Sequence, residues 1–228
     1  MEILFEDNHL IAINKSVADI VQVDKTGDES LEQKVKQFIK NKYNKPGEAF
    51  LGVVHRIDRP VSGIVLFART SKALARLNQM FQDKEIKKIY WAIVKDKPVN
   101  NNGTLIHYIV RDAKKNKSFA HDTEVKDSKK AILHYKILDN SENYCLLEIQ
   151  LETGRHHQIR CQLAKIGCPI RGDLKYGYNR SLDNGGINLH SRYMEFVHPV
   201  TQTLVKIFAE PPKEKLWNFF LERNKSVE

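Results

Sequence analysis

The most informative stretch of the chain runs His55-Arg56-Ile57-Asp58-Arg59-Pro60-Val61-Ser62-Gly63 and continues directly into Ile64-Val65-Leu66-Phe67-Ala68. The apolar run is short, follows a segment with turn chemistry, and therefore predicts a buried strand. Asp58 stands between two arginines. A carboxylate kept ionised by neighbouring cations is a fixed anion, which can act as a nucleophile or a base. Ion-pair networks are also common outside active sites, so an ordinary Asp–Arg turn network stays open.

The elements around this strand follow from local patterns. A hairpin is expected over residues 3–13, and helices are expected after a cap at Asp28 or Ser30 and after Thr70 or Ser71. Residues 111–130 are mostly charged and predict an exposed hairpin or a flexible loop. Further strands are expected at 88–94, 132–138, 144–151, 187–189 and 203–208, and further helices at 156–166 and 215–221. This mixed order predicts one α+β domain over residues 1–228, built on a largely antiparallel mixed sheet with flanking helices.

The composition is that of a soluble globular protein: of the 228 residues, 41% are hydrophobic and 29% are charged. No apolar run is long enough to span a membrane, and the acidic N-terminus lacks the features of a signal peptide. The cysteines are odd in number and have no Cys-x-x-Cys spacing: Cys145, Cys161 and Cys168. They predict reduced thiols in a cytoplasmic protein.

The formal net charge of +9 suggests a polyanionic partner, although a generically basic protein would have the same charge. The distribution of the charge favours nucleic acid, because the lysines gather in two segments. The first contains Lys34, Lys36, Lys40, Lys42 and Lys45, and the second contains Lys114, Lys115, Lys117, Lys126, Lys129 and Lys130.

A second informative segment runs Leu151-Glu152-Thr153-Gly154-Arg155-His156-His157-Gln158-Ile159-Arg160. It reads as the end of a strand, a glycine turn and the start of a helix, and a helix N-terminus attracts anions. Arg155 in the turn would face phosphates. Arg160 follows an apolar residue and is expected to point inward, where a buried arginine needs a carboxylate. Asp58 is the obvious candidate.

Metal chemistry is weakly supported. His156 and His157 are adjacent, so they would not share one face of a helix, and no third ligand has a suitable spacing. The chain also lacks a glycine-rich phosphate loop, a Gly-x-Ser-x-Gly motif and a His-Glu-x-x-His motif. We expect chemistry based on Asp, Tyr, Arg and His, with no metal and no cofactor.

The motif His55-Arg56-Ile57-Asp58-Arg59-x-x-Ser62-Gly63 resembles the catalytic motif of the RluA-type pseudouridine synthases. Further segments match that family in the same order along nearly the whole chain. They are Glu6-Asp7-Asn8-His9-Leu10 with Asn14-Lys15, Lys88-Ile89-Tyr90-Trp91-Ala92-Ile93-Val94, Thr153-Gly154-Arg155-x-His157-Gln158-Ile159-Arg160, Gly167-x-Pro169-Ile170-x-Gly172-Asp173-x-x-Tyr176-Gly177, Leu189-His190 and Phe196-x-His198-Pro199.

The resemblance implies an isomerase that converts uridine in RNA to pseudouridine without a cofactor. The bond from ribose C1′ to uracil N1 breaks, the base turns, and C5 joins C1′. The family's invariant Asp corresponds to Asp58, its active-site Tyr to Tyr90, and its buried Arg to Arg160, which would pair with Asp58. From the residues alone, the favoured interpretation of Tyr90 is a core tyrosine in a strand.

The resemblance also implies RNA-binding roles. Arg56 would occupy the space left by a flipped uridine, Leu189 would form an apolar wall for the uracil, and Arg155 and His157 would contact the RNA. Plain core packing remains open for Leu189. The expected partner is ribosomal or transfer RNA, no membrane is involved, and the chain is expected to be a monomer.

Two departures from the family pattern affect loop geometry: Ser16 stands where Pro is usual, and Val61 where Thr is commoner. No separate N-terminal RNA-binding domain precedes the match, so we expect the catalytic domain alone to select the RNA. A second hypothesis is a non-catalytic RNA-binding or ribosome-assembly factor on the same fold. The set of Asp58, Tyr90 and Arg160 discriminates between the two, since a pure binder has no need of it.

Overall fold

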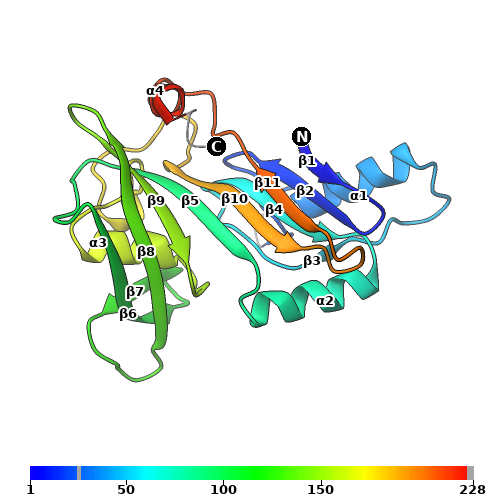
Figure 1. Cartoon of the computed structure of the whole chain (residues 1–228), viewed down its shortest axis with the longest axis horizontal. Helices are drawn as coiled ribbons and strands as arrows, with labels where there is room; N and C mark the ends of the chain where they lie inside the picture. Colours follow the sequence, from blue (N-terminus) through cyan, green and yellow to red (C-terminus); the bar gives the residue numbers. More distant parts are fainter. Residues whose placement is uncertain (25–26, 225–228) are drawn as a thin grey trace. The chain divides into compact units, whose positions relative to one another are not determined.

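A computed structural model describes residues 1–24 and 27–224. The chain divides into two compact units, each assembled from two separate stretches of sequence (Figure 1). The first unit consists of Met1–Lys87 and Ser191–Glu210, and the second of Lys88–His190 and Pro211–Glu228.

The first unit is built on a sheet with two helices, α1 (Leu31–Lys42) and α2 (Ser71–Gln82). Its strands are β1 (Glu2–Glu6), β2 (Leu10–Lys15), β3 (Gly52–Val53), β4 (Ser62–Ala68), β10 (Leu189–Val197), which enters this unit at Ser191, and β11 (Leu204–Phe208). The order is β1-β2-β4-β10, with β3 paired to β4 and β11 to β10. The pairs β1–β2, β2–β4, β3–β4 and β10–β11 are antiparallel.

Both helices of this unit begin where the sequence predicts a cap. The Ser30 hydroxyl accepts the N–H of Gln33 at 3.3 Å, and the Gln33 side chain accepts the N–H of Ser30 at 2.8 Å, which forms a capping box. The Thr70 hydroxyl caps α2 by accepting the N–H of Ala73 at 3.2 Å.

Strand β4 forms the centre of the core of this unit. Every residue from Ser62 to Ala68 is buried, so the prediction of a buried strand is confirmed. Ile64 and Leu66 pack in one apolar cluster with residues of β2, α2, β10 and β11. In Figure 1, α2 lies alongside β3 and β4, which it contacts.

The second unit has the strand order β5-β9-β8-β6-β7, and all its pairs are antiparallel. The strands are β5 (Lys87–Val94), β6 (Asn102–Asp112), β7 (Lys117–His121), β8 (Lys129–Asn140) and β9 (Cys145–Leu151). The helices are α3 (Gln158–Lys165), the 3-10 helix η1 (Leu174–Tyr176) and α4 (Lys215–Asn224). The charged segment after Arg111 is therefore a hairpin, formed by β6 and β7.

Helix α4 covers one face of this sheet. Trp217 and Phe220 pack with Trp91 and Ile93 of β5 and with Leu146 of β9. Antiparallel pairing and flanking helices confirm the α+β class with a largely antiparallel sheet. Within the described part of the chain, we find no helix with the length and apolar character needed to cross a membrane.

Candidate active site

Asp58 lies in a tight turn that leads into β4. The N–H of Val61 donates to the carbonyl of Asp58 at 3.0 Å, which closes the turn. The segment before it is fixed beside β4, because the Nε2 atom of His55 accepts the N–H of Leu66 at 2.9 Å. The ring of His55 also stacks on Phe81, with centroids 5.1 Å apart. The half-buried Asp58 side chain is thus carried by a turn anchored at both ends.

The two arginines beside Asp58 are placed differently from each other. The Arg59 guanidinium forms an ion pair with Asp28 at 2.8 Å. Arg56 is exposed and makes no ion pair within residues 1–24 and 27–224, so it is available to a ligand. The negative charge of Asp58 acts on Lys15, where it opposes the lowering of the lysine pKa.

Lys15 is buried beneath this turn, with 1% of its surface exposed. Its ammonium donates to three backbone carbonyls, of Ser16 at 2.9 Å, Asp19 at 2.8 Å and Arg59 at 3.1 Å. Burial lowers the pKa of Lys15 to about 8, and the negative charges of Asp19 and Asp58 oppose that shift. One ammonium therefore joins the chain after β2 to the turn that carries Asp58.

Tyr90 lies in the middle of β5, opposite Ile149 of β9. Because side chains alternate along a strand, Tyr90 points away from the face on which Trp91 and Ile93 contact α4. Its side chain is 7% exposed. The sequence could not say which face of this strand covers the core, and in the structure the face of Trp91 packs against α4.

Arg160 lies in the first turn of α3 and is buried, as expected. Its guanidinium makes a bidentate pair with Asp173, with Nε 2.7 Å from Oδ2 and Nη2 2.9 Å from Oδ1. A buried arginine needs such a carboxylate, and from the sequence we expect Asp58 in this role rather than Asp173. Asp58 belongs to the other unit, so its pairing with Arg160 stays a prediction. Asp173 was visible in the Gly172-Asp173 motif but carried no role.

His156 and His157 lie at the start of α3, which begins at Gln158, two residues later than expected. His157 has a left-handed φ of 53°, and the two rings stack with centroids 3.8 Å apart. Their Nδ1 atoms bond to different hydroxyls, His156 to Ser118 at 2.8 Å and His157 to Tyr176 at 2.9 Å. Burial lowers the pKa of His157 to about 2, so the ring is neutral.

The turn before α3 is fixed by Gln158. Its side-chain oxygen accepts the N–H of Arg155 at 2.9 Å and the hydroxyl of Thr153 at 2.8 Å, and its amide donates to the carbonyl of Ile132 at 3.1 Å. Arg155 itself is exposed, and its Nε donates to the carbonyl of Lys130 at 3.0 Å. The motif therefore presents one arginine at the surface on a rigid turn.

Leu189 opens β10 and is 4% exposed, so it is buried in this structure. Its N–H donates to the carbonyl of Ile187 at 2.8 Å. Burial is what core packing predicts, whereas a wall for the uracil needs surface that the base can reach, so that role of Leu189 stays a prediction.

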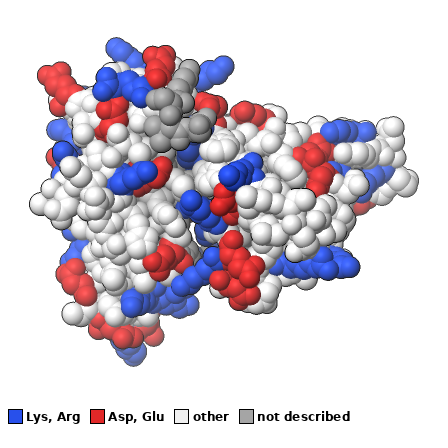
Figure 2. Space-filling model, in the orientation of Figure 1, with Lys and Arg blue, Asp and Glu red and all other residues white. Residues whose placement is uncertain are grey.

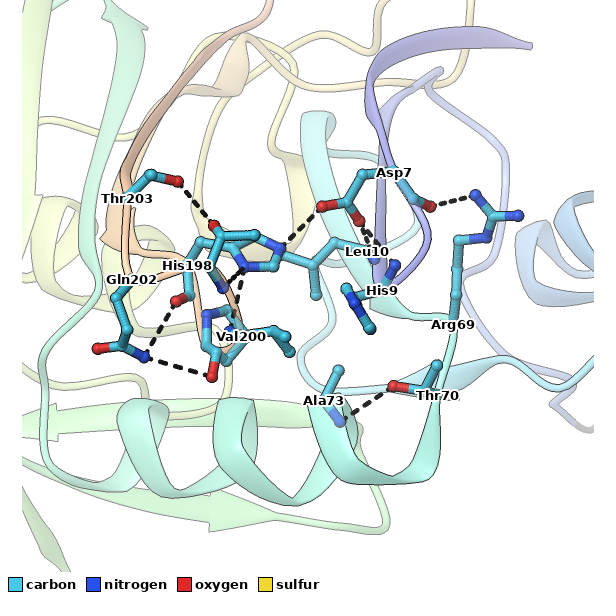
Figure 3. A network of polar contacts seen from close by, with 12 residues as sticks. Asp7, His9, Leu10, Arg69, Thr70, Ala73, His198, Val200, Gln202 and Thr203 are labelled. Carbon is cyan, nitrogen blue, oxygen red and sulfur yellow. Dashed lines mark hydrogen bonds and ion pairs between the residues drawn. The ribbon is translucent and has the colours of Figure 1, made fainter.

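The motifs near the two ends of the match meet in one polar network of the first unit (Figure 3). Asp7 accepts the N–H groups of His9 and Leu10, each at 2.7 Å, and its Oδ2 lies 2.9 Å from Nε2 of His198. His198 Nδ1 accepts the N–H of Val200 at 3.1 Å. A neutral His198 therefore carries its proton on Nε2, facing Asp7. This network ties the β1–β2 hairpin to the β10–β11 hairpin and explains both motifs structurally.

The residues that bear chemistry therefore divide between the units. Asp58 and Arg56 belong to the first unit. The second holds Tyr90 and Leu189 together with a connected group on and around α3: Arg155, His157, Gln158, Arg160, Asp173 and Tyr176. Within residues 1–24 and 27–224 no three His, Cys, Asp or Glu side chains gather in a way that could hold a metal ion.

Residues 9–165 match the family described as RNA pseudouridylate synthase. This chain belongs to that family. The ribosomal large subunit pseudouridine synthase D of Zymomonas mobilis is 31% identical over 94% of this chain and 70% of its own length. The RNA pseudouridine synthase YlyB of Bacillus subtilis is 36% identical over 72% of this chain, but the match spans about half of that relative (53%).

The fold is that of the same family. The solved structure of human RNA pseudouridylate synthase domain containing 4 superimposes with a TM-score of 0.79, covering 98% of this chain and 93% of that one, at 23% identity. The prediction of an RluA-type family member from the ordered motifs is confirmed.

Proposed function

We propose that this chain converts uridine in RNA to pseudouridine, with Asp58 as the catalytic carboxylate. The observation that carries the proposal is the family match over residues 9–165, which contains Asp58, Tyr90 and Arg160. In this isomerisation the C1′–N1 bond breaks and a C5–C1′ bond forms. The proton lost from C5 balances the one gained at N1, so the reaction needs no oxidant or reductant.

Each residue of the set has a role that its chemistry suits. Asp58 attacks the nucleoside or assists cleavage of the glycosidic bond. Tyr90 stacks on the base and helps to remove the C5 proton. Arg160, which makes two hydrogen bonds to Asp173, is proposed to pair with Asp58. Leu189 supplies an apolar wall for the uracil.

RNA is the proposed partner, and ribosomal RNA is favoured because a relative is named a ribosomal large subunit pseudouridine synthase. Arg56 is proposed to fill the space of the flipped uridine, which its exposure permits. Arg155 and His157 are proposed to help bind the RNA. We further propose that the chain works as a single catalytic domain and a monomer in the cytoplasm, without metal or cofactor.

The ion pairing of the surface lysines indicates where the RNA would lie. On the face shown in Figure 2, basic and acidic side chains are interspersed, so this face has no broad basic patch. Ion pairing is more informative, because a lysine already paired with a carboxylate has less attraction left for a phosphate. Four lysines of α1 are paired: Lys34 with Asp19, Lys36 with Glu32, Lys40 with Glu48, and Lys42 with Glu6.

The second lysine segment is different. Lys114 and Lys115 at the β6–β7 turn, and Lys126 and Lys129 before and at the start of β8, are exposed. In the described part of the chain, none of these four forms an ion pair. We therefore assign the main RNA contact to this segment rather than to the lysines between Lys34 and Lys45, which the sequence had placed first together with Arg155.

The alternative is an RNA-binding or ribosome-assembly factor without catalysis. The same lysines would serve it, but Asp58 and Tyr90 would then be dispensable. The discriminating experiment compares the purified protein with its Asp58→Asn variant on ribosomal RNA, with pseudouridine mapped by chemical labelling. We expect the modification to disappear while RNA affinity stays within about twofold, because Asn keeps the shape of Asp and removes the nucleophile.

Asp28→Asn is the matched control, since it removes a neighbouring carboxylate that pairs with Arg59. It should retain turnover. Mapping pseudouridine across total RNA from cells with and without the protein then identifies the target. Full turnover by Asp58→Asn would contradict the assigned mechanism, and no modification by the unaltered protein on any cellular RNA would favour the non-catalytic alternative.

A further inference from the structure

The β6–β7 hairpin is docked onto η1 and the start of α3 by three hydrogen bonds. The N–H of Ser118 on β7 donates to the hydroxyl of Tyr176 at 2.8 Å, and the Ser118 hydroxyl bonds to Nδ1 of His156 at 2.8 Å. Lys175 donates to the carbonyl of Asn116, in the turn of the hairpin, at 3.0 Å. Residues of η1 and of the turn before α3 thus hold one strand of the hairpin and its turn.

Tyr176 connects these docking contacts to Arg160. Its hydroxyl accepts the Ser118 N–H, so its own hydrogen is free to go to the neutral Nδ1 of His157, 2.9 Å away. Its ring lies beneath two cations, with Cζ of Arg160 5.0 Å and Nζ of Lys117 5.1 Å from the ring centroid. The side chain is 7% exposed.

Packing alone does not explain this arrangement. A phenylalanine would fill the same space and would not bring a buried hydroxyl that requires partners. The hydroxyl finds both of its partners in the docking contacts, one on β7 and one at the cap of α3. The ring in turn packs against the face of the Arg160 guanidinium, whose edge makes the bidentate pair with Asp173.

We propose that Tyr176 is a positioning residue that couples contact between RNA and the β6–β7 hairpin to the orientation of Arg160. The inference rests on the proposed function and deepens it. Phosphates drawn to the exposed lysines of the hairpin turn pull on β7, and the Ser118–Tyr176 hydrogen bond transmits that displacement to the ring. Lys117 lies over the same ring, so its movement toward a phosphate also changes the environment of Arg160. RNA contact thereby changes the orientation of the Arg160 guanidinium.

Tyr176→Phe tests the coupling, because it removes the hydroxyl and keeps the ring beneath both cations. We expect the single-turnover rate constant at saturating RNA to fall about 10- to 100-fold, as small misplacements of catalytic groups do. RNA affinity should change less than about twofold, since the lysines remain. The control is Tyr193→Phe, which removes a hydroxyl bonded to Glu195 in the first unit and should change neither quantity.

A double-mutant cycle separates coupling from simple support of the fold. Lys114→Gln combined with Lys115→Gln changes the exposed turn of the hairpin. In the unaltered background it should lower both RNA affinity and the saturated rate, whereas in the Tyr176→Phe background it should lower affinity alone. Additive effects on the rate, or a Tyr176→Phe rate equal to that of the unaltered protein, would overturn the coupling. Absence of turnover in the unaltered protein would instead refute the proposed function.

Lys117→Met keeps the inference testable should Tyr176→Phe fail to fold, because it leaves the hydroxyl and its partners intact. We expect its saturated rate to fall about 3- to 10-fold, with Lys117→Arg restoring most of the loss, since Arg keeps a cation over the ring. A Lys117→Met rate equal to that of the unaltered protein would argue against the coupling.

Discussion

Gly63 and the backbone of Ser191 lie so close together that β4 has no room for a side chain at this position. A Cβ atom on Gly63 would be 2.3 Å from the carbonyl oxygen of Ser191 and 2.6 Å from its nitrogen. The φ angle of Gly63 is +109°, which side chains rarely tolerate. Steric contact and backbone conformation therefore both require glycine here. The turn that carries Asp58 ends at Val61, two residues before this point.

Gly63→Ala should destabilise the protein by more than conformational strain alone. A strained φ costs about 1–3 kcal/mol, and the backbone clash adds to this. Gly177→Ala is the matched control, since its φ is +100° but its Cβ would meet nothing within 4 Å. Urea unfolding of both variants measures the difference. Equal losses of unfolding free energy would show that β4 and β10 adjust to the extra atom at no cost.

Lys15 should titrate well below an ordinary lysine. We expect its 13Cε resonance to change with a midpoint near pH 8, compared with the ordinary value of 10.5, because burial disfavours the charged form. The neutral amine has two N–H groups for three carbonyls, so the turn of Asp58 should loosen. Single-turnover rates should therefore fall as pH rises above about 8. A midpoint above pH 10 would contradict this assignment.

The lowered pKa of Lys15 also makes the unfolding free energy depend on pH in a defined direction. The folded-state pKa of Lys15 lies below the unfolded value, so the folded protein binds fewer protons between about pH 8 and pH 10.5. The contribution of Lys15 to the unfolding free energy therefore increases as pH rises through this window, and it is lost as pH falls through about 8. Urea unfolding of the unaltered protein and of Lys15→Met across this range measures it, and parallel pH profiles would refute it.

The sequence predicts the helices and strands that depend on neighbouring residues alone. The capped helices α1 and α2 and the buried strand β4 follow from caps and apolar runs, and all three are confirmed. Strand β10 was missed beyond its first residue, because His190, Ser191 and Arg192 are polar and yet buried. Arg192 is satisfied by a distant carbonyl, of Ala209 at 2.6 Å, which no local pattern reveals.

For the candidate site too, the sequence identifies residues but does not reveal their contacts with distant parts of the chain. The motifs point to Asp58, Tyr90 and Arg160 as residues, but the contacts of Lys15 and Arg160 are long-range in sequence. Asp173 follows Arg160 by 13 positions, and Lys15 reaches Arg59 across 44. The late start of α3 depends on the left-handed conformation of His157, which is unusual for a residue other than glycine.

Two sets of lysine substitutions should affect RNA binding differently although they remove the same charge. Lys114, Lys115, Lys126 and Lys129, changed together to Gln, should lower the slope of log affinity against log salt by about 0.7 to 0.9 for each phosphate that is no longer neutralised. The same change at Lys34, Lys36, Lys40 and Lys42 should leave the slope nearly unchanged, because carboxylates already pair with them. Equal slopes for the two sets would remove the basis for placing RNA on the β6–β7–β8 side.

Tyr90→Phe should separate RNA binding from completion of the reaction. Phe keeps the ring that is proposed to stack on the flipped uracil and loses the hydroxyl assigned to proton transfer at C5. Substrate RNA should bind within about twofold of the unaltered protein, while the single-turnover rate falls about 100-fold or more. Tyr90→Ala should impair both, because it also removes the ring.

Tyr135→Phe provides the control for this prediction. Tyr135 lies in β8 of the same unit, is 7% exposed like Tyr90, and has a hydroxyl 3.4 Å from the carbonyl of Asn100. Removing that hydroxyl should alter neither binding nor rate. Tyr90 points away from the face that α4 covers, so its hydroxyl is not needed to pack Trp91 against Trp217. A wild-type rate in Tyr90→Phe would therefore mean that the hydroxyl takes no part in the chemistry, and Tyr90 would act through its ring alone.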